Sequence, residues 1–451
     1  MTAKYFGTNG IRGKFDFLNE EFALKAAIAI GTYFNNGKIV VGRDVRLTGE
    51  RLNNAVLAGL TSIGCEVIDL GVVTSPTAEF MIKKLNADGL IIITASHLPP
   101  EYNALKVVDR DGVSVSRERG EDIEKLMLTN KNTNYKNVKP VLKYKNATSD
   151  HITAMIKLIG KNIEKIKSKK YKVAVDCANA TMCLIAPYVL RDLLGCQIIS
   201  INSQIDGTFP GRDSEPTKEN IKELISIVKA TKCDLGIAFD CDGDRVTLVD
   251  ENGEFVIGDK ITALSFLIKL QEKKGSVVTT VATSKATQDV AEKFGVKTIY
   301  TKVGAPYICE AVLENKCVSG GEEVGGVIWP ELSLAKDGIF TAVKIIEHMA
   351  LTGKKLSEAI AQVPVYYNHK IKISAKSDEK QTMLKKAKAY ATKKKLKINE
   401  IDGIRVDFAD SWVIVRASGT EDYVRIFAEA KTQEKAQQLV NEYEQIVKAQ
   451  Y

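Results

Sequence analysis

The chain has 451 residues, of which 45% are hydrophobic and 27% are charged, and its formal net charge is +8. This length is too great for one hydrophobic core and predicts about three or four domains, while the composition predicts a globular protein rather than a disordered one. Basic residues gather towards the C-terminus, but no recognisable nucleic-acid-binding module accompanies them, so we predict no nucleic-acid partner. The longest apolar runs, such as residues 89–93, are too short to cross a membrane.

The cysteines and the first residues predict the cellular compartment. The eight cysteines are scattered and form no Cys-x-x-Cys pair, which is typical of reduced core thiols rather than of disulfides or a zinc site. Residues 1–5 show no basic segment followed by an apolar stretch, so no signal peptide is indicated. We therefore predict a cytoplasmic protein and make no prediction of its oligomeric state.

The first 365 residues repeat one scheme, in which a helical pattern leads to a short apolar strand that ends in a polar or glycine-rich loop. Strands are predicted over residues 87–93, 235–239 and 317–319, because short apolar runs bounded by turn residues are typical of buried strands. Helices alternating with strands predict an α/β architecture, in which ligands gather at the carboxyl ends of the strands. We therefore predict three related α/β domains, over residues 1–150, 151–255 and 256–365.

The last section, residues 366–451, has a different pattern. Strands are predicted over residues 366–373, 403–408, 411–415 and 423–428, with helices over residues 379–393 and 434–449. Several strands and two helices in a short section are typical of a smaller α+β domain with an antiparallel sheet.

Two N-terminal segments carry arginines near glycines. Residues 6–13 place three glycines around Arg12, which suggests a loop that faces a phosphate group, although a plain turn is the alternative. Arg43 and Arg46 follow a predicted strand and are either part of such a site or structural ion-pairing residues.

Ser96 and His97 follow the predicted strand at residues 87–93. A serine held at the end of a buried strand, with a neighbouring histidine, can act as a nucleophile or a phosphate carrier. A serine that caps the start of a helix would give the same pattern. Lys106, on a strand predicted over residues 104–108, is either a surface lysine or a proton-transfer group beside this serine.

Three carboxylates alternate in the loop between the predicted strands 235–239 and 246–249: Asp240, Asp242 and Asp244, followed by Arg245. Anions packed so closely repel unless a cation lies among them, and ligation by carboxylates alone suits a hard ion such as Mg²⁺. An acidic surface turn is one alternative. A calcium EF-hand is another, but it needs glycine where Arg245 stands and a helix on each side.

Two further loops offer polar groups that suit a ligand, hydrogen-bond acceptors in one and donors in the other. Residues 320–326 combine four glycines with Glu322 and a second glutamate, which could accept hydrogen bonds from hydroxyl groups; a mobile turn is the alternative. The C-terminal loop offers donors to a phosphate dianion, with an ordinary polar turn as its alternative. These donors are Arg416, Ser418, Gly419, Thr420 and Arg425.

Taken together and in this order, these loops resemble those of the α-D-phosphohexomutase family, which comprises phosphoglucomutases, phosphomannomutases and phosphoglucosamine mutases. The resemblance covers essentially the whole chain and is greatest to archaeal members in the segment 320–330 and in Asp337 and Gly338. It implies three α/β domains with mixed sheets and a smaller α+β domain around a central cleft, with one loop from each domain.

The resemblance also implies a role for each site residue. Ser96 corresponds to the phosphoserine, and one of its phosphate oxygens joins Asp240, Asp242 and Asp244 as Mg²⁺ ligands. Arg12 and Arg245 lie near the transferring phosphate, and His97 and Lys106 are proton-transfer groups. Glu322 binds sugar hydroxyls, and the C-terminal loop holds the phosphate that is not transferred: Arg416, Ser418, Gly419, Thr420 and Arg425.

The predicted function is interconversion of hexose 6-phosphate and hexose 1-phosphate, through a hexose 1,6-bisphosphate that also serves as activator. We favour phosphoglucosamine mutase, with phosphomannomutase or phosphoglucomutase as the alternative. A catalytically degenerate relative that only binds sugar phosphate is a further alternative, and a phosphatase is disfavoured because hydrolysis needs no second phosphate grip. Four departures from the family pattern motivate the degenerate alternative: Leu98, Ala104, Val324 and Asp422.

Overall fold

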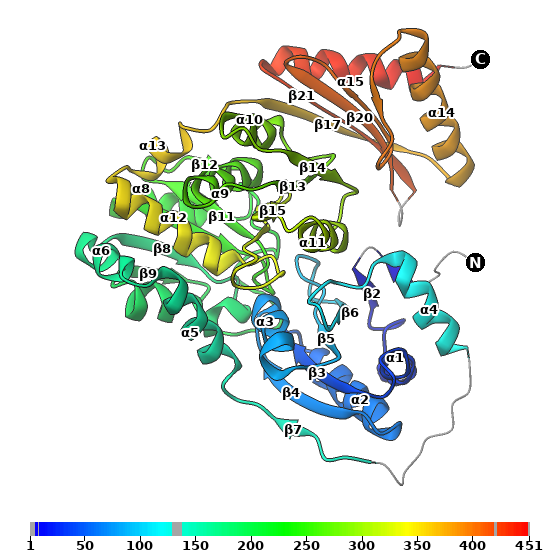
Figure 1. Cartoon of the computed structure of the whole chain (residues 1–451), viewed down its shortest axis with the longest axis vertical. Coiled ribbons are helices and arrows are strands. Elements are labelled where there is room, and N and C mark those ends of the chain that lie inside the picture. Colours follow the sequence, from blue (N-terminus) through cyan, green and yellow to red (C-terminus); the bar gives the residue numbers. More distant parts are fainter. Residues whose placement is uncertain (1–4, 8, 129–137, 419–421, 450–451) are drawn as a thin grey trace.

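The computed structural model describes residues 5–7, 9–128, 138–418 and 422–449. The chain forms four sheets, called A to D in chain order, arranged in an arc with the N-terminal and C-terminal domains at its two ends (Figure 1). The predicted α/β class is confirmed, as are the mixed sheets of the first three domains and the antiparallel sheet of the last.

Sheet A forms the first domain and has the order β1-β2-β6-β5-β3-β4-β7, with both parallel and antiparallel neighbours. Its strand β5 is buried along its whole length, as expected of a continuous apolar run at the centre of a covered sheet. The elements are β1 (Phe6–Gly7), β2 (Gly10–Lys14), α1 (Glu20–Tyr33), β3 (Lys38–Arg43), α2 (Gly49–Ser62), β4 (Glu66–Val72), α3 (Ser75–Leu85), β5 (Gly89–Ile93), β6 (Tyr102–Asp109), α4 (Arg117–Met127) and β7 (Leu142–Lys143).

Sheet B has the order β12-β11-β10-β8-β9. Strands β8, β9 and β10 are parallel, and the antiparallel pair β10–β11 encloses the carboxylate loop at its tip. The elements are α5 (Ala147–Ile159), α6 (Asn162–Lys169), β8 (Lys172–Asp176), η2 (Thr181–Leu184), α7 (Ala186–Tyr188), η3 (Val189–Leu193), β9 (Gln197–Ile201), α8 (Lys222–Thr231), β10 (Leu235–Phe239), β11 (Val246–Asp250) and β12 (Phe255–Val256).

Sheet C has the order β14-β13-β15-β16, with only the last pair antiparallel. Helix α12 begins where the Asp337 side chain accepts a hydrogen bond from the Phe340 amide, and it ends at Gly353 in a left-handed conformation. The elements are α9 (Gly258–Glu272), β13 (Val277–Thr280), α10 (Lys285–Lys293), β14 (Thr298–Thr301), α11 (Ala305–Glu314), β15 (Ser319–Gly321), β16 (Val327–Ile328), α12 (Gly338–Thr352) and α13 (Leu356–Ile360).

Sheet D is fully antiparallel, with the order β17-β21-β20-β19-β18. The predicted strands and helices of this section all occur with small shifts at their ends, and the short strand β18 was not predicted. The elements are β17 (Tyr367–Ser374), α14 (Ser377–Lys393), β18 (Ile398–Asn399), β19 (Ile404–Asp407), β20 (Ser411–Ala417), β21 (Tyr423–Ala430) and α15 (Gln433–Lys448).

The hydrophobic cores connect the domains to different degrees. One continuous cluster runs from α5, β8 and β10 through α9 to α12, so the second and third domains share a core. The C-terminal domain has its own core and meets the third domain through a small cluster in which Trp412 and Phe427 pack near Val281 and Ala282. The second and third domains therefore form a single packed unit, to which the C-terminal domain is attached by a smaller contact.

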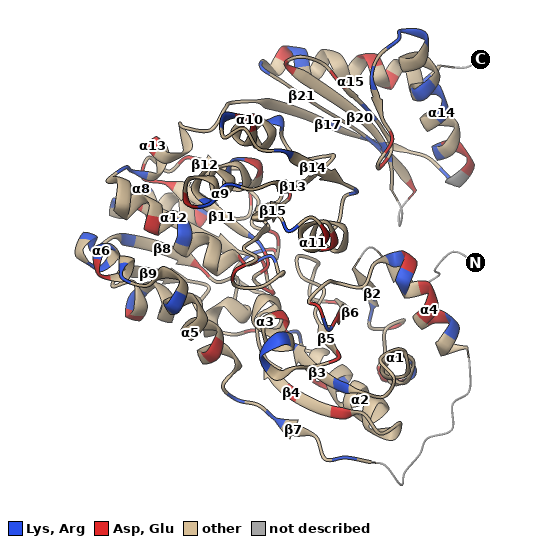
Figure 2. Cartoon of the chain, viewed as in Figure 1, with Lys and Arg blue, Asp and Glu red and all other residues tan. Residues whose placement is uncertain are grey.

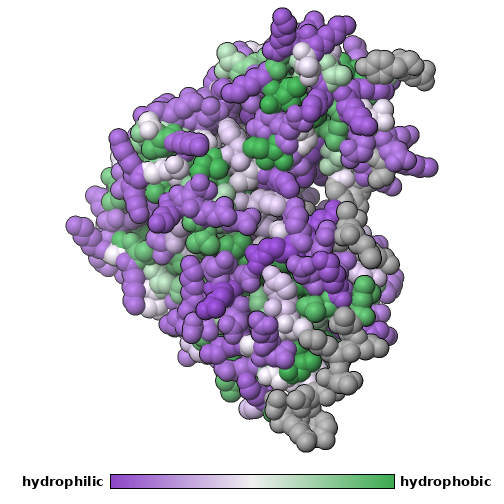
Figure 3. All heavy atoms as spheres, turned by 45° about the vertical axis from the view of Figure 1, so that its right-hand side comes forward, coloured by the Kyte–Doolittle hydropathy of each residue, from purple (hydrophilic) through white to green (hydrophobic). Residues whose placement is uncertain are grey.

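The surface is mainly hydrophilic on the face seen in Figure 3, where hydrophobic side chains form separate spots. Among the described residues, we find no helix with the length and hydropathy needed to cross a membrane.

Candidate active site

The loop that carries Ser96 connects β5 to β6 and is held by a single buried arginine. Ser96 has a φ of 53°, a left-handed conformation that is costly for a residue with a side chain and persists only where the surroundings enforce it. The guanidinium of Arg46 donates hydrogen bonds to four carbonyl oxygens of this segment, at 2.7 Å for Ser96 and 2.7 Å for Leu98. The other two acceptors are the carbonyl oxygens of Pro99 and Tyr102.

Arg46 is itself fixed by Asp44. The two side chains form a fully buried ion pair at 2.9 Å, and the Thr94 hydroxyl donates to the same carboxylate at 2.7 Å. The Ser96 amide in turn donates to the Thr94 hydroxyl at 3.0 Å. The sequence suggested that Arg46 was either a phosphate-site residue or a structural one, and its contacts are structural: it fixes the backbone that presents Ser96.

The carboxylate loop lies directly against Ser96. The Ser96 hydroxyl donates to Asp240 Oδ2 at 2.7 Å, although 144 positions separate the two residues. Asp240, Asp242 and Asp244 are all buried, and one oxygen of each lies within 4.8 Å of those of the others. The amides of Gly243 and Arg245 donate to Asp240 Oδ1 at 3.1 and 3.2 Å, which shapes the loop around the three carboxylates.

The donor set of this loop fits a divalent cation. Asp242 Oδ1 and Asp244 Oδ1 are buried and have no hydrogen-bond partner in the part of the chain that the structure describes. Buried carboxylate oxygens without partners are costly, and a hard cation with oxygen ligands would satisfy both. The predicted cluster of three carboxylates that could hold a metal ion is therefore confirmed.

Two buried lysines neutralise part of this charge. Lys106 Nζ, from β6, lies 2.6 Å from Asp242 Oδ2. Lys336 Nζ lies 3.1 Å from Asp244 and 2.5 Å from Glu322. Lys336 was not singled out from the sequence, although it immediately precedes Asp337 and Gly338. It joins the predicted sugar-binding glutamate to the carboxylate loop.

The pKa values in this cluster follow from burial and charge. Burial and the neighbouring charges of Asp242 and Asp244 hold the pKa of Asp240 well above its usual range. Burial would raise the pKa of Asp242 as well, but the Lys106 ammonium outweighs it and holds that pKa low. Burial would lower the pKa of Lys106, but Asp242 and Asp244 raise it above its usual value, so Lys106 is protonated.

His97 lies beside Ser96, and Glu215 connects His97 to Arg245, because its Oε2 is 3.8 Å from His97 Nδ1. His97 Nδ1 is 3.5 Å from Ser96 Oγ, and Arg245 Nη1 donates to Glu215 Oε2 at 2.7 Å. Burial and the positive charges of Arg245 and Arg12 lower the pKa of His97 to about 2, so the imidazole is neutral at physiological pH. Glu215 was missed because nothing in its sequence neighbourhood distinguishes it from a surface glutamate.

Arg12 reaches the same region from β2, where it is opposite Ala104 of β6. Its side chain is exposed to solvent, unlike the lysines beneath the carboxylates. The positive charge of Arg12 lowers the pKa of His97, and the charge of Arg245 in turn lowers the pKa of Arg12. Arg12 is therefore a solvent-exposed member of the same group.

The loop that carries Glu322 packs on the carboxylate loop. The Val246 amide donates to the Gly325 carbonyl, and a Cβ atom on Gly325 would lie 2.3 Å from the Val246 carbonyl oxygen. Gly325 also has a φ of 79°, so a side chain there would be strained as well as crowded. This close approach explains why the loop needs glycine at this position.

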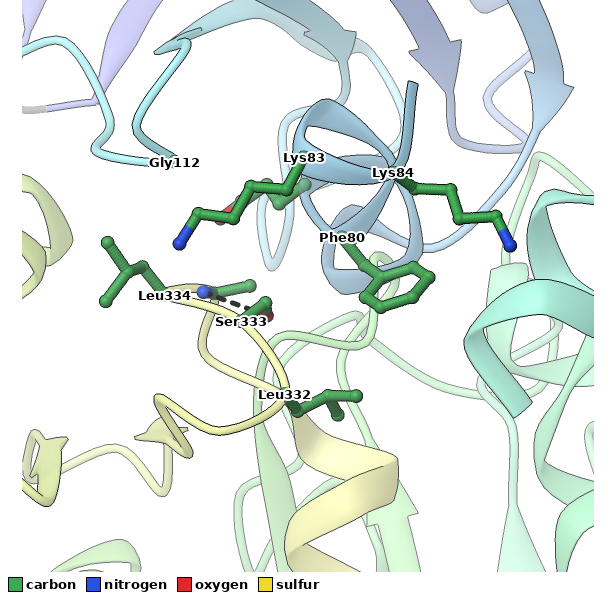
Figure 4. Close-up of a pocket in the computed structure, with 9 residues that line it drawn as sticks. Phe80, Lys83, Lys84, Gly112, Leu332, Ser333 and Leu334 are labelled. Atoms are coloured by element: carbon green, nitrogen blue, oxygen red, sulfur yellow. Dashed lines mark hydrogen bonds between the residues drawn. The ribbon is translucent and has the colours of Figure 1, made fainter. Parts of the chain in front are cut away.

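The first and third domains also meet behind these residues. A pocket of about 280 Å³ lies between α3 and the segment 332–335, with Phe80, Lys83 and Leu334 among its lining residues (Figure 4). Glu79 lies at this pocket, and burial raises its pKa to about 8, against the lowering effect of the nearby Lys106 charge.

The C-terminal residues form a separate group. Arg416 on β20 and Arg425 on β21 are directly opposite one another, and like charges in that position repel unless an anion or a carboxylate lies between them. Arg416 donates to Asp402 at 2.7 Å, Arg425 donates to the Tyr423 hydroxyl at 2.6 Å, and the Ser418 amide donates to the Tyr423 carbonyl. Gly419 and Thr420 lie outside the described residues.

The structure thus brings most of the predicted residues together and leaves one set apart. Hydrogen bonds, ion pairs and short contacts connect Ser96, His97, Lys106, Arg245, Glu322 and the three aspartates, partly through Glu215 and Lys336. Arg12 is close enough for its charge to lower the pKa of His97. Among the described residues, the bonds of Arg416 and Arg425 are to Asp402 and Tyr423 of the C-terminal domain, not to that group.

Models of the phosphoglucomutase/phosphomannomutase family match the chain in four successive parts. Three are described as alpha/beta/alpha domains I, II and III and match residues 3–134, 149–253 and 257–367. The fourth is described as the C-terminal domain and matches residues 371–446. The chain belongs to this family. The predicted resemblance is confirmed, and with it the prediction of a phosphohexomutase at the level of the family.

Individual relatives span nearly the whole chain. A phosphoglucomutase/phosphomannomutase of Thermococcus kodakarensis is 43% identical and covers 96% of each chain. A probable phosphoglucosamine mutase of Methanopyrus kandleri is 37% identical and covers 99% of this chain and 98% of its own. A solved structure of a phosphoglucomutase/phosphomannomutase family protein from Burkholderia thailandensis shares the fold, with a TM-score of 0.85, 23% identity and coverage of 99% and 98%.

Proposed function

We propose that this chain is a Mg²⁺-dependent phosphohexomutase that acts preferentially on glucosamine phosphate. The observation that carries the proposal is the hydrogen bond of 2.7 Å between Ser96 Oγ and Asp240, within a buried group of three carboxylates. This arrangement puts a hydroxyl that can carry a phosphoryl group against oxygen ligands that suit Mg²⁺.

In the proposed reaction the bond between phosphorus and Ser96 Oγ breaks as a sugar hydroxyl oxygen forms a new bond to phosphorus. The hydroxyl proton leaves for a base, and the product is a hexose 1,6-bisphosphate. The bond between the second phosphorus and its sugar oxygen then breaks as Ser96 Oγ, giving up its proton, bonds to that phosphorus. The sugar oxygen takes up a proton, and the phosphoserine is restored. Transfers of this kind depend mainly on positioning and on stabilising charge.

The proposed ligands of the metal are Asp240, Asp242, Asp244 and a phosphate oxygen on Ser96, and the ion would neutralise the charge that develops on the transferring group. Arg12 and Arg245 add positive charge on the open side. Lys106 is protonated and can donate a proton, while His97 is neutral and 3.5 Å from Ser96 Oγ. We retain both as the proposed proton-transfer groups.

Glu322 and the C-terminal arginines are the proposed substrate-binding residues. Glu322 would accept hydrogen bonds from sugar hydroxyls, with its orientation set by Lys336. Arg416, Ser418, Gly419, Thr420 and Arg425 would hold the phosphate that is not transferred. We also propose domain boundaries near residues 150, 255 and 365, which the separate sheets support, and a cytoplasmic location, which eight free cysteines support.

Replacing Ser96 with alanine tests the mechanism. Ser96→Ala should have no measurable turnover in a coupled mutase assay, and intact-mass measurement should find one phosphate on the wild type that the variant lacks. Ser62→Ala is the matched control, because this hydroxyl bonds only to its own helix. Near-normal turnover of Ser96→Ala would contradict the mechanism, and an unphosphorylated, inactive wild type would favour the degenerate alternative.

A comparison of three substrates tests the sugar preference. Glucosamine 1-phosphate, glucose 1-phosphate and mannose 1-phosphate are assayed with the matching bisphosphate present, and we expect the highest kcat/KM for glucosamine 1-phosphate. The Thermococcus kodakarensis relative favours the second candidate, a phosphoglucomutase/phosphomannomutase. A higher kcat/KM with glucose or mannose 1-phosphate would select that candidate.

A further inference from the structure

A second pocket lies at the edge of sheet B opposite to the carboxylate loop. It has a volume of about 470 Å³, which is within the range of small-molecule sites. Its lining includes the residues that precede β8 and β10 and the turn that follows β11. Five lysines line it, and we call it the lysine pocket: Lys169, Lys229, Lys232, Lys354 and Lys355.

None of these five ammonium groups makes an ion pair or a hydrogen bond with the part of the chain that the structure describes. Many other lysines of this chain do have acidic partners, including Lys167, which pairs with Glu164 only two residues before Lys169. Lysines that converge on one concave space without partners repel one another, and an anion bound among them would relieve that repulsion.

The two carboxylates in the lysine pocket are already engaged elsewhere. Asp234 accepts a hydrogen bond of 2.7 Å from the Lys172 amide. Glu251 accepts hydrogen bonds from the amide and the hydroxyl of Ser357, at 3.2 and 2.5 Å. Because each carboxylate is held by another group and only two face five lysines, the pocket keeps an excess of positive charge.

Helix ends account for part of this arrangement but not for all of it. Helices α6, α8 and α12 end at the pocket, and lysines near the last turn of a helix offset its negative end by about 0.3–1 kcal/mol each. That effect needs no common cavity, because each lysine could point to solvent from its own helix. These three helices instead end on one side of the molecule, away from both termini (Figure 1), where basic positions are visible on and around α6 (Figure 2).

We propose that the lysine pocket binds a small anion that carries two or more phosphate groups. Several separate ammonium groups around a cavity suit a ligand with several charges better than a single phosphate. The cavity has an apolar side formed by Cys233 and Met349, and the half-buried Tyr171 adds a ring at its rim. A concave pocket of this size favours a small ligand over a nucleic acid, which needs an extended basic surface.

This site is distinct from the proposed active site. The strand β10 separates Asp234 in the pocket from Asp240 in the carboxylate loop, and five extended residues span about 17 Å. Anion binding in the lysine pocket is therefore independent of the mutase proposal, because none of the residues that line the pocket contacts Ser96 or the three aspartates.

Inorganic tripolyphosphate is the probe that tests the proposal, with the full-length protein. Isothermal calorimetry measures its affinity, and hydrogen exchange locates it. We expect slower exchange in residues 229–234 and 250–256 on binding. The variant Lys229→Ala/Lys232→Ala/Lys355→Ala should bind about tenfold more weakly or worse, since it loses three charge-assisted contacts, and should lose this protection.

A matched control separates the pocket from general charge effects. Lys385→Ala/Lys393→Ala/Lys397→Ala removes the same charge from exposed positions of the C-terminal domain and should bind tripolyphosphate like the wild type. All six lysines are accessible to solvent, so both variants should fold, and their exchange without ligand checks this. Three results would overturn the proposal: no protection of residues 229–234 in the wild type, equal weakening in both variants, or tighter binding of a single-stranded oligonucleotide than of tripolyphosphate to these lysines.

Discussion

The group around Ser96 and the arginine pair of the C-terminal domain are built in opposite ways. Around Ser96, residues from three domains are buried and linked through Asp240, Lys106 and Lys336. In the C-terminal domain, Arg416 and Arg425 lie nearer to the surface, and each bonds to a residue of its own domain. Substitutions around Ser96 should therefore change stability and catalysis together, whereas substitutions at the arginine pair should change ligand affinity alone.

The largest effect is expected from Arg46→Lys. A lysine offers a single ammonium group, whereas the guanidinium of Arg46 donates hydrogen bonds to Asp44 and to four carbonyl oxygens. At least two buried carbonyls would lose their donor, at about 1–3 kcal/mol each. We expect the free energy of unfolding of the first domain, measured by urea titration, to fall by about 3–5 kcal/mol. Turnover should fall as well, because the backbone that presents Ser96 is no longer held in place.

Arg43→Lys is the control for this variant, because Arg43 lies three positions before Arg46, at the end of β3, and its pairing with Glu50 involves a largely exposed carboxylate. It should change the free energy of unfolding by less than about 1 kcal/mol. If the two variants proved equally stable, the role of Arg46 in holding the Ser96 loop would be wrong.

Mg²⁺ should stabilise the protein through the carboxylate loop. At a hundredfold excess over its dissociation constant, a ligand that binds only the folded state adds about 2.7 kcal/mol to the free energy of unfolding. Thermal unfolding in EDTA and in excess Mg²⁺ measures this difference. Asp244→Asn should lose most of the shift because Asp244 Oδ1 is one of the two carboxylate oxygens of the cluster that are buried without a partner. An equal shift in the variant would place the ion elsewhere.

The two groups also differ in how far the sequence predicted them. The strand at residues 235–239 was predicted with the bounds of β10, and the strand predicted at residues 87–93 contains β5, because buried apolar runs and polar loops are local signals. Their loops were predicted as functional for the same reason. Contacts such as Ser96 with Asp240 depended on family resemblance, since 144 positions separate the partners.

The residues that were missed have no local signal. Lys336 acts by reaching both Asp244 and Glu322, and Glu215 by bonding Arg245. Both roles depend on contacts between residues far apart in the chain, and the Lys336 contacts also require the second and third domains to pack together. A lysine or glutamate in a polar segment is usually a surface residue. Arg46 was noticed, but only its tertiary contacts distinguish the structural role from phosphate binding.

Arg416→Ala should weaken substrate binding with little effect on stability. Its ion pair with Asp402 is partly exposed, at 21% for each side chain, so its loss should cost less than about 1 kcal/mol of stability. The loss of a charge-assisted contact to a phosphate should raise KM about tenfold or more. Steady-state kinetics and urea unfolding measure the two effects, and Arg425→Ala should show a smaller rise because that side chain is exposed. A large loss of stability in Arg416→Ala would show that the arginine pair, like the group around Ser96, affects stability as well as ligand binding.

The smallest effect is expected from Asp422→Asn, which removes a carboxylate close to the proposed phosphate-binding residues. The Asp422 side chain is 79% exposed and lies 3.4 Å from Lys380, so solvent screens its charge strongly. Removing it should lower KM for a sugar phosphate by a factor of about two, because one repulsive charge near the dianion is lost, and the difference should disappear at high salt. Asp410→Asn is the matched control, an exposed carboxylate beside the opposite end of β20, and should leave KM unchanged. A rise in KM for Asp422→Asn would mean that Asp422 helps to bind the substrate, for example by orienting Lys380, and that the C-terminal group is more interdependent than its exposure indicates.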